Sequence, residues 1–178
     1  PKACGKTTTA EQQASSVLYM DDPQKQEQYR QLASTNITYL LEGETPRLID
    51  EWQEVPQFWD AIRFMVDHRE GDGQFILTGS AVPVKSDEIR HTGTGRYGWL
   101  KMRPMSLWES GESSGKVSLS ELLLSPEVIA ADNKLQLRDL AFLVCRGGWP
   151  KAVSKQTERA ALMQAKEYFK SIISNDIS

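Results

Sequence analysis

The first seven residues carry the pattern with the clearest chemistry. They read Pro1-Lys2-Ala3-Cys4-Gly5-Lys6-Thr7 and fit the phosphate loop G-x-x-x-x-G-K-[ST], with only its opening glycine absent. In such a loop, backbone N–H groups point inward around a triphosphate, and the following helix offers its positive N-terminal end. A bare G-K-[ST] arises by chance in roughly one chain in ten of this length. A lysine-tipped helix start is therefore an open alternative.

The side chains of this loop have separate expected tasks. Lys6 reaches the β- and γ-phosphates as a point charge, Gly5 lets the backbone approach the phosphates, and the Thr7 hydroxyl ligates Mg²⁺. The expected ligands are therefore ATP and Mg²⁺. The residues expected to bind the nucleotide are Ala3, Cys4, Gly5, Lys6, Thr7 and Thr8.

A second informative stretch is a brief apolar strand, 46–50, that ends in the acidic pair Asp50 and Glu51. This pattern places a metal-associated aspartate and a water-orienting glutamate at the carboxyl edge of a parallel sheet, where open α/β sheets bind ligands. Asp50 is expected to hold Mg²⁺ through water, and Glu51 to orient and polarise the attacking water. A strand that ends in an acidic turn is common, so that alternative stays open.

Hydroxyl and guanidinium groups follow in the next segments. Thr78 and Ser80 lie in the turn that follows the strand expected at 74–77, and they are expected to sense the γ-phosphate, although a simple turn is the alternative. Arg96 lies between a glycine-rich turn and a fifth strand expected at 97–102. We expect it to stabilise phosphate charge, within its own subunit or across an oligomer contact.

Alternating helical and extended patterns indicate how these residues are positioned. We expect a short helix at 7–14, a strand at 16–20, a surface helical pair or a lid at 24–41, a helix at 56–69 and a strand at 74–77. After a linker at 111–115, helices are expected at 117–124, 136–144 and 157–173. Strands that alternate with helices predict an α/β fold with a parallel sheet.

Composition limits the class of protein. The chain has 178 residues, of which 39% are hydrophobic and 25% charged, as in soluble globular proteins. No apolar run approaches the ~18 residues of a membrane span. The net charge of -3 argues against a generic polyanion-binding surface, although a local basic patch stays open. Cys4 and Cys145 are too few for a disulfide scaffold, and free thiols suit a reducing compartment. We therefore expect a cytoplasmic protein with no membrane association.

Several stretches taken in order resemble a known family. They are GKTTTAE, RLIDEWQ, FILTGSA, HTGTGR, MRPMSLWESGE and CRGGWP. Together they resemble bacterial and archaeal predicted ATPases of the AAA+-type superfamily, in which the ATPase half precedes a nuclease-like C-terminal domain. The resemblance implies an ASCE-class P-loop fold with Lys6 and Thr7 in the first motif, Asp50 and Glu51 in the second, and Thr78 to Ser80 as first sensor.

The turn at 147–150 also resembles an element of related ATPases. In the STAND group a glycine-x-proline element lies beside the adenine, which implies that Gly148 and Pro150 contact the base. A helix C-cap followed by a rigid turn is the alternative.

The chain departs from the family in two respects. The opening glycine and the strand before it are missing, and no C-terminal domain follows, so we expect a fragment of a longer protein whose missing domain is a partner. Without its entering strand, the phosphate loop of the chain as given is expected to bind nucleotide poorly, because ordering the loop costs about 1–2 kcal/mol per residue.

The expected architecture is a three-layer α/β P-loop NTPase core at 1–110, truncated at its first strand, followed by a helical subdomain at 116–178. The expected function is that of a regulatory switch that binds ATP and hydrolyses it slowly with Mg²⁺. A second copy of the chain, in a homo-oligomer, is a further expected partner. A GTPase is disfavoured, because no N-K-x-D-type sequence is present. Two alternatives stay open: a non-hydrolysing nucleotide-binding interaction module, and the ATPase part of a nucleic-acid-linked motor or defence protein.

Overall fold

The computed structural model describes residues 2–79, 93–125, 127 and 134–176. The chain divides into two compact units, each of which is described by itself. The first unit comprises Lys2 and Cys4–Met102, and the second comprises Ala3 and Arg103–Ser178.

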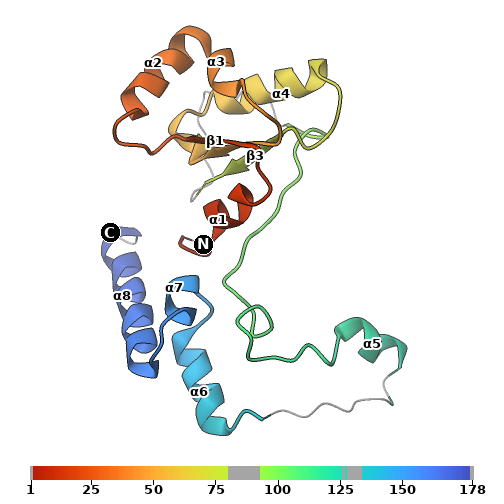
Figure 1. Cartoon of the computed structure of the whole chain (residues 1–178), viewed down its shortest axis with the longest axis vertical. Coiled ribbons are helices and arrows are strands. Elements are labelled where there is room, and N and C mark those ends of the chain that lie inside the picture. Colours follow the sequence, from red (N-terminus) through yellow and green to blue (C-terminus); the bar gives the residue numbers. More distant parts are fainter. Residues whose placement is uncertain (1, 80–92, 126, 128–133, 177–178) are drawn as a thin grey trace. The chain divides into compact units, whose positions relative to one another are not determined.

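The first unit alternates helices and strands as the sequence predicts (Figure 1). Its elements in chain order are α1 (Lys6–Glu11), β1 (Ser16–Tyr19), α2 (Gln26–Asn36), α3 (Thr38–Leu41), β2 (Arg47–Asp50), the 3₁₀ helix η1 (Trp52–Glu54), α4 (Phe58–His68) and β3 (Phe75–Thr78). The predicted helices and strands up to residue 78 are all present, within a few residues of their expected bounds.

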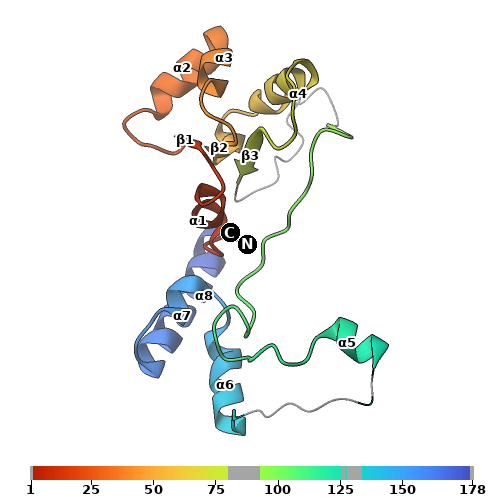
Figure 2. The same cartoon turned by 45° about the vertical axis from the view of Figure 1, so that its right-hand side comes forward.

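The three strands form one parallel sheet in the order β1-β2-β3, and its register aligns Tyr19, Asp50 and Thr78 at the carboxyl ends. Right-handed connections between successive parallel strands place α2, α3 and α4 on one face. Figures 1 and 2 both show these helices on one side of the strands and α1 on the other. The unit therefore has the three layers of the predicted α/β P-loop NTPase fold, which is confirmed.

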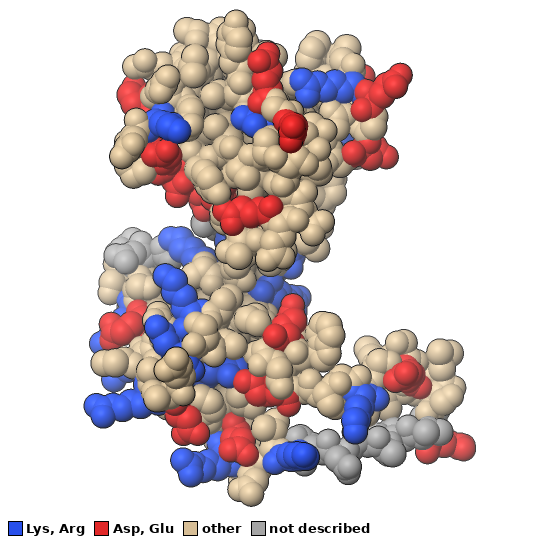
Figure 3. Space-filling view, viewed as in Figure 1, with Lys and Arg blue, Asp and Glu red and all other residues tan. Residues whose placement is uncertain are grey.

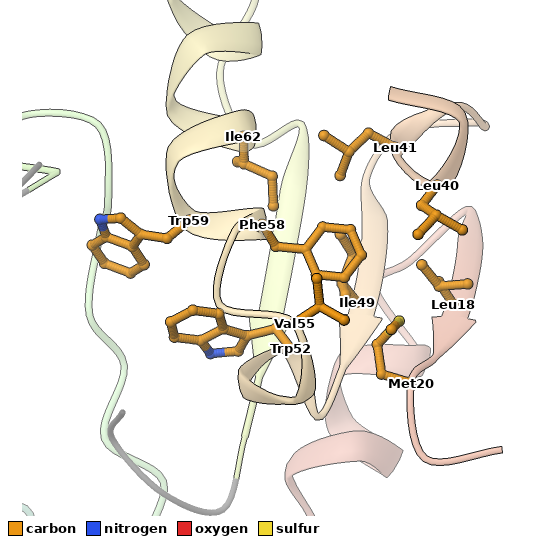
Figure 4. Close-up of a cluster of buried hydrophobic side chains, with 10 residues drawn as sticks. All are labelled: Leu18, Met20, Leu40, Leu41, Ile49, Trp52, Val55, Phe58, Trp59 and Ile62. Atoms are coloured by element: carbon orange, nitrogen blue, oxygen red, sulfur yellow. The ribbon is translucent and has the colours of Figure 1, made fainter. Parts of the chain in front are cut away.

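A buried apolar cluster holds the helices on the sheet (Figure 4). Phe58 and Ile62 of α4 and Leu41 of α3 are almost completely buried against Ile49 of β2. Leu48, the residue before Ile49, is fully buried and belongs to the opposite face, because side chains alternate along a strand. Burial of each such side chain contributes about 1.5–3 kcal/mol. The central strand β2 is thus packed on both faces directly before its last residue, Asp50.

The strand expected at 97–102 does not form, and this prediction is wrong. Tyr97 instead stacks on Trp59, with ring centroids 3.9 Å apart, and its hydroxyl donates to the Trp59 carbonyl at 2.6 Å. Trp99 and Leu100 are 75% and 83% exposed. An extended segment becomes a strand only where a neighbouring strand pairs with its backbone groups. Within the described residues, the sheet ends at β3, and no strand pairs with this segment.

The second unit is helical, as predicted. Its helices are α5 (Leu119–Leu124), α6 (Leu137–Arg146), α7 (Pro150–Val153) and α8 (Glu158–Asp176). Leu143, Ala152 and Ala161, one from each of the last three helices, are buried. The sequence does not predict α7, which begins at Pro150, a residue that is well suited to the first position of a helix.

The segment before α5 is anchored to the end of α6. The Arg146 side chain is only 6% exposed and forms an ion pair with Glu112 at 2.5 Å. The Met105 backbone N–H donates to the Gly148 carbonyl at 2.7 Å. These contacts explain why the division between the units falls at Met102, whereas the sequence predicts a boundary between 110 and 116.

Candidate functional site

Three polar side chains from separate parts of the chain meet at the carboxyl edge of the sheet. The Thr7 hydroxyl donates to Asp50 Oδ1 at 2.8 Å, and the Thr78 hydroxyl donates to the same oxygen. Asp50 and Thr78 are 5% and 9% exposed. The register places Asp50 beside Thr78, and α1 contacts both β2 and β3. The structure therefore brings together residues from the predicted phosphate loop, acidic motif and sensor.

The phosphate loop turns sharply where α1 begins. Gly5 precedes the helix with a φ of 99°, a left-handed conformation that glycine adopts without the steric cost of a Cβ atom. Its carbonyl accepts a hydrogen bond from the Thr9 N–H at 2.9 Å. Cys4 is buried, Lys6 is partly exposed and Thr8 is exposed. This turn places Thr7 in the first turn of α1.

Glu51 has a backbone conformation that is unusual for its residue type. Its φ is 52°, in the left-handed region, at the junction between β2 and η1. Such a conformation costs about 1–3 kcal/mol in a residue with a side chain, and strained residues of this kind cluster at functional sites. The Glu51 carboxylate accepts a hydrogen bond from Nε2 of Gln53. The predicted site omits Gln53, although its place in the same acidic turn is a signal that could have found it.

The donor set fits a magnesium ion. Carboxylate and hydroxyl oxygens are the ligand types that Mg²⁺ prefers, with water completing its octahedral shell. Thr7 supplies a hydroxyl and Asp50 a carboxylate, within 2.8 Å of each other. The predicted metal-binding residues are thus adjacent, and their chemistry suits the metal.

Arg96 does not lie beside Asp50 and the two threonines that bond to it. Its guanidinium donates to Asp67 near the end of α4, with Nε 2.9 Å from Oδ1. This hydrogen bond lowers the pKa of the Asp67 carboxyl below its ordinary value. Because α4 runs back from the carboxyl ends of the strands, Asp67 lies near the amino edge of the sheet, opposite Asp50. The other predicted sensor, Ser80, lies outside the described residues.

Gly148 and Pro150 belong to the second unit, where their contacts are those of a helix end. A Cβ atom at Gly148 would overlap the Met105 carbonyl oxygen, and Pro150 opens α7. A cavity of about 220 Å³ lies nearby, and neither residue lines it. Its lining includes Val144, Gly147, Trp149, Tyr168 and Phe169. The geometry therefore matches the C-cap alternative, and the adenine contact stays a prediction.

The close approach at Gly148 makes a prediction about stability. Replacing Gly148 with alanine is expected to destabilise the second unit by about 1–3 kcal/mol, because the new methyl group meets rigid backbone rather than a flexible side chain. Thermal unfolding without nucleotide, followed by circular dichroism, measures this effect. Gly98→Ala is the control, since a Cβ there has open space around it. Equal stability of the two variants would contradict the close approach of Gly148 to the Met105 carbonyl.

Comparison with known proteins adds one finding. A family model described as an AAA domain matches residues 1–110. Neither the curated proteins nor the solved structures compared with the chain show a significant match. Within the described residues, no helix combines the length and the apolar character needed to cross a membrane.

Proposed function

Because the chain belongs to the AAA domain family, we propose that it binds ATP with Mg²⁺ and hydrolyses the nucleotide slowly, as a regulatory switch. Family membership and the α/β P-loop fold support the coarser statement, a nucleotide-binding P-loop protein. The observation that carries the finer proposal is the convergence of Thr7, Asp50 and Thr78 on one carboxylate oxygen at the carboxyl edge of the sheet.

The hydrogen bond between Thr7 and Asp50 prepares both residues for a cation. A hydroxyl has one proton and two lone pairs, so a Thr7 hydroxyl that donates to Asp50 keeps its lone pairs available. Thr7 and Asp50 would hold Mg²⁺, which when bound neutralises charge on the β- and γ-phosphate oxygens.

The remaining residues act on the substrate and on water. Lys6 binds the β- and γ-phosphates as a positive charge, and the loop backbone around Gly5 surrounds them. Glu51 orients and polarises the water that attacks the γ-phosphate, while the Thr78 hydroxyl senses this phosphate. Catalysis then comes mostly from positioning and charge neutralisation, which is the general pattern of phosphoryl transfer.

Arg96 enters this proposal only through an oligomer. Since its guanidinium is held by Asp67 near the amino edge of the sheet, it would stabilise phosphate charge on a neighbouring copy rather than on its own. The possible homo-oligomer is part of the proposal for this reason alone.

A role in binding nucleic acid has less support. Lys and Arg side chains gather over the helical unit, with acidic residues among them (Figure 3). Lys170 Nζ lies 2.8 Å from Glu167 Oε1, and Arg138 Nη2 lies 3.6 Å from Glu158 Oε2. Acidic neighbours weaken the uninterrupted positive potential on which phosphate-backbone binding depends. The proposal therefore rests on ATP rather than on a polynucleotide.

Phosphate release from Mg-ATP by the purified full-length protein tests the proposed function. We expect turnover that stops when EDTA removes Mg²⁺, and a Thr7→Ala variant whose turnover falls about ten- to hundredfold, since it loses a metal-holding group. Thr9→Ala is the matched control, because Thr9 is an exposed threonine of the same helix. A non-hydrolysing interaction module would instead bind ATP without releasing phosphate, and that result would overturn the proposal.

A further inference from the structure

Gln53 lies between the ends of the two strands that carry the site. Its Nε2 donates to the Glu51 carboxylate, just after β2. On its other side, a Cβ atom placed on Gly79, just after β3, would overlap Oε1 of Gln53. The Gln53 amide therefore fills the space between Glu51 and the backbone of Gly79.

Chemistry determines which way this amide faces. An ionised carboxylate only accepts hydrogen bonds, so the nitrogen of Gln53 must be the atom that faces Glu51. The amide oxygen then points away from Glu51, where it is buried and has no hydrogen-bond partner among the residues that the structure describes. A buried carbonyl group without a partner is destabilising, so the oxygen does not hold the amide in place. Its position is set by the bond to Glu51 and by packing against Gly79.

Hydrogen bonds and ring packing hold the backbone on either side of Gln53. Gln53 is the middle residue of η1, and the Glu54 N–H donates to the Glu51 carbonyl at 3.0 Å. The preceding Trp52 is 6% exposed and stacks on Trp59, with ring centroids 5.5 Å apart. A short helix fixed in this way presents the Gln53 side chain to Glu51 in one orientation.

We propose that Gln53 is a positioning residue that holds the Glu51 carboxylate in its working orientation, and that Gly79 is required because only glycine leaves room for the Gln53 amide. This inference rests on the proposed function, in which Glu51 orients the attacking water. The amide also connects Glu51 to the end of β3, where Thr78 bonds to Asp50. The water-orienting residue and the phosphate sensor are thereby joined in one packed unit.

Two variants remove this support by different routes. Gln53→Met keeps the length of the side chain but removes its hydrogen-bond donor. Gly79→Ala leaves Gln53 intact but displaces its amide, because the new Cβ takes the place of Oε1. Both are expected to lower kcat for ATP hydrolysis about ten- to hundredfold with little change in KM, since misplacement of a reacting group by about 1 Å has effects of this size. Gly98→Ala, with open space at its Cβ, is expected to keep the wild-type kcat.

Double variants separate positioning from a general effect on folding. In a Gln53→Ala background there is no amide to displace, so adding Gly79→Ala is expected to lower kcat no further. A second independent loss of kcat in the double variant would overturn the inference. The melting temperatures of all the variants are expected to remain close to that of the wild type.

The outcomes also distinguish this inference from the proposed function. If the wild type hydrolyses ATP while Gln53→Met and Gly79→Ala keep its kcat, or raise only KM, the positioning role is overturned and the proposed function stands. If the wild type binds ATP but releases no phosphate, both are overturned.

Discussion

In the full-length protein, replacing Glu51 with glutamine is expected to abolish ATP turnover while ATP affinity stays close to that of the wild type. Glutamine has nearly the same shape but cannot accept a proton from the attacking water, and general-base assistance contributes about 10²–10⁴-fold to such reactions. Lys6→Ala is expected to do the reverse and lose binding, because Lys6 contacts the phosphates in the ground state. Calorimetry with Mg-ATP measures affinity, and phosphate release measures turnover.

Glu54→Gln is the matched control for the Glu51→Gln variant. Glu54 lies in η1, three residues after Glu51, and its carboxylate pairs with Arg30 at 2.7 Å. It is not a member of the proposed site, so turnover is expected to stay near the wild-type rate. Hydrolysis by Glu51→Gln at the wild-type rate would show that the acidic motif is wrongly assigned. A non-hydrolysing module predicts no turnover in the wild type and no effect of either glutamine.

Replacing Arg146 with alanine is expected to destabilise the second unit by about 1–3 kcal/mol. The guanidinium is 6% exposed, and its removal leaves the Glu112 carboxylate, 21% exposed, without its positive partner. Removal of one member of such an ion pair leaves the other without its partner and is destabilising, whereas replacing both members with apolar residues is often neutral. We therefore expect the Arg146→Leu, Glu112→Leu double variant to be more stable than Arg146→Ala. Denaturant unfolding of the two variants measures the difference.

An exposed ion pair of the same unit is the control. Arg138 is 85% exposed and lies 3.6 Å from Glu158, so Arg138→Ala is expected to change the free energy of unfolding by less than about 1 kcal/mol. If Arg146→Ala and Arg138→Ala had equal effects, the ion pair between Arg146 and Glu112 would not stabilise the unit.

The ion pair between Arg146 and Glu112 makes the stability of the second unit depend on pH. The hydrogen bond from Arg146 lowers the pKa of Glu112 below its ordinary value of 4.5. A carboxyl whose pKa is lowered by folding stabilises the folded state above its ordinary pKa. This stabilisation is lost as the pH falls from about 4.5 through the lowered pKa. Glu112→Gln is expected to remove this part of the acid sensitivity, which unfolding midpoints measured between about pH 6 and pH 3 would show.

The sequence by itself is sufficient to predict the three observed strands and the grouping of Asp50 with Thr78. Short apolar runs that end in polar residues predicted the strands, and parallel strands end at the same edge. Asp50 and Thr78 were therefore expected to lie together, as the structure shows. The phosphate-loop pattern likewise placed Thr7 at a helix start. These predictions needed only local patterns and one general rule of topology.

Tertiary structure alone decided the features that depend on a partner distant in the sequence. The apolar segment 97–102 had a strand-like pattern, but a strand needs a neighbour for its backbone, and Tyr97 packs on Trp59 instead. Arg96 was expected at the phosphates, yet it pairs with Asp67, because a long charged side chain binds whichever carboxylate folding brings within reach. The contact of Gln53 with Gly79 has the same origin. A residue's pattern in the chain indicates which element it occupies, but its partner is determined by the packing of elements that are separated in sequence.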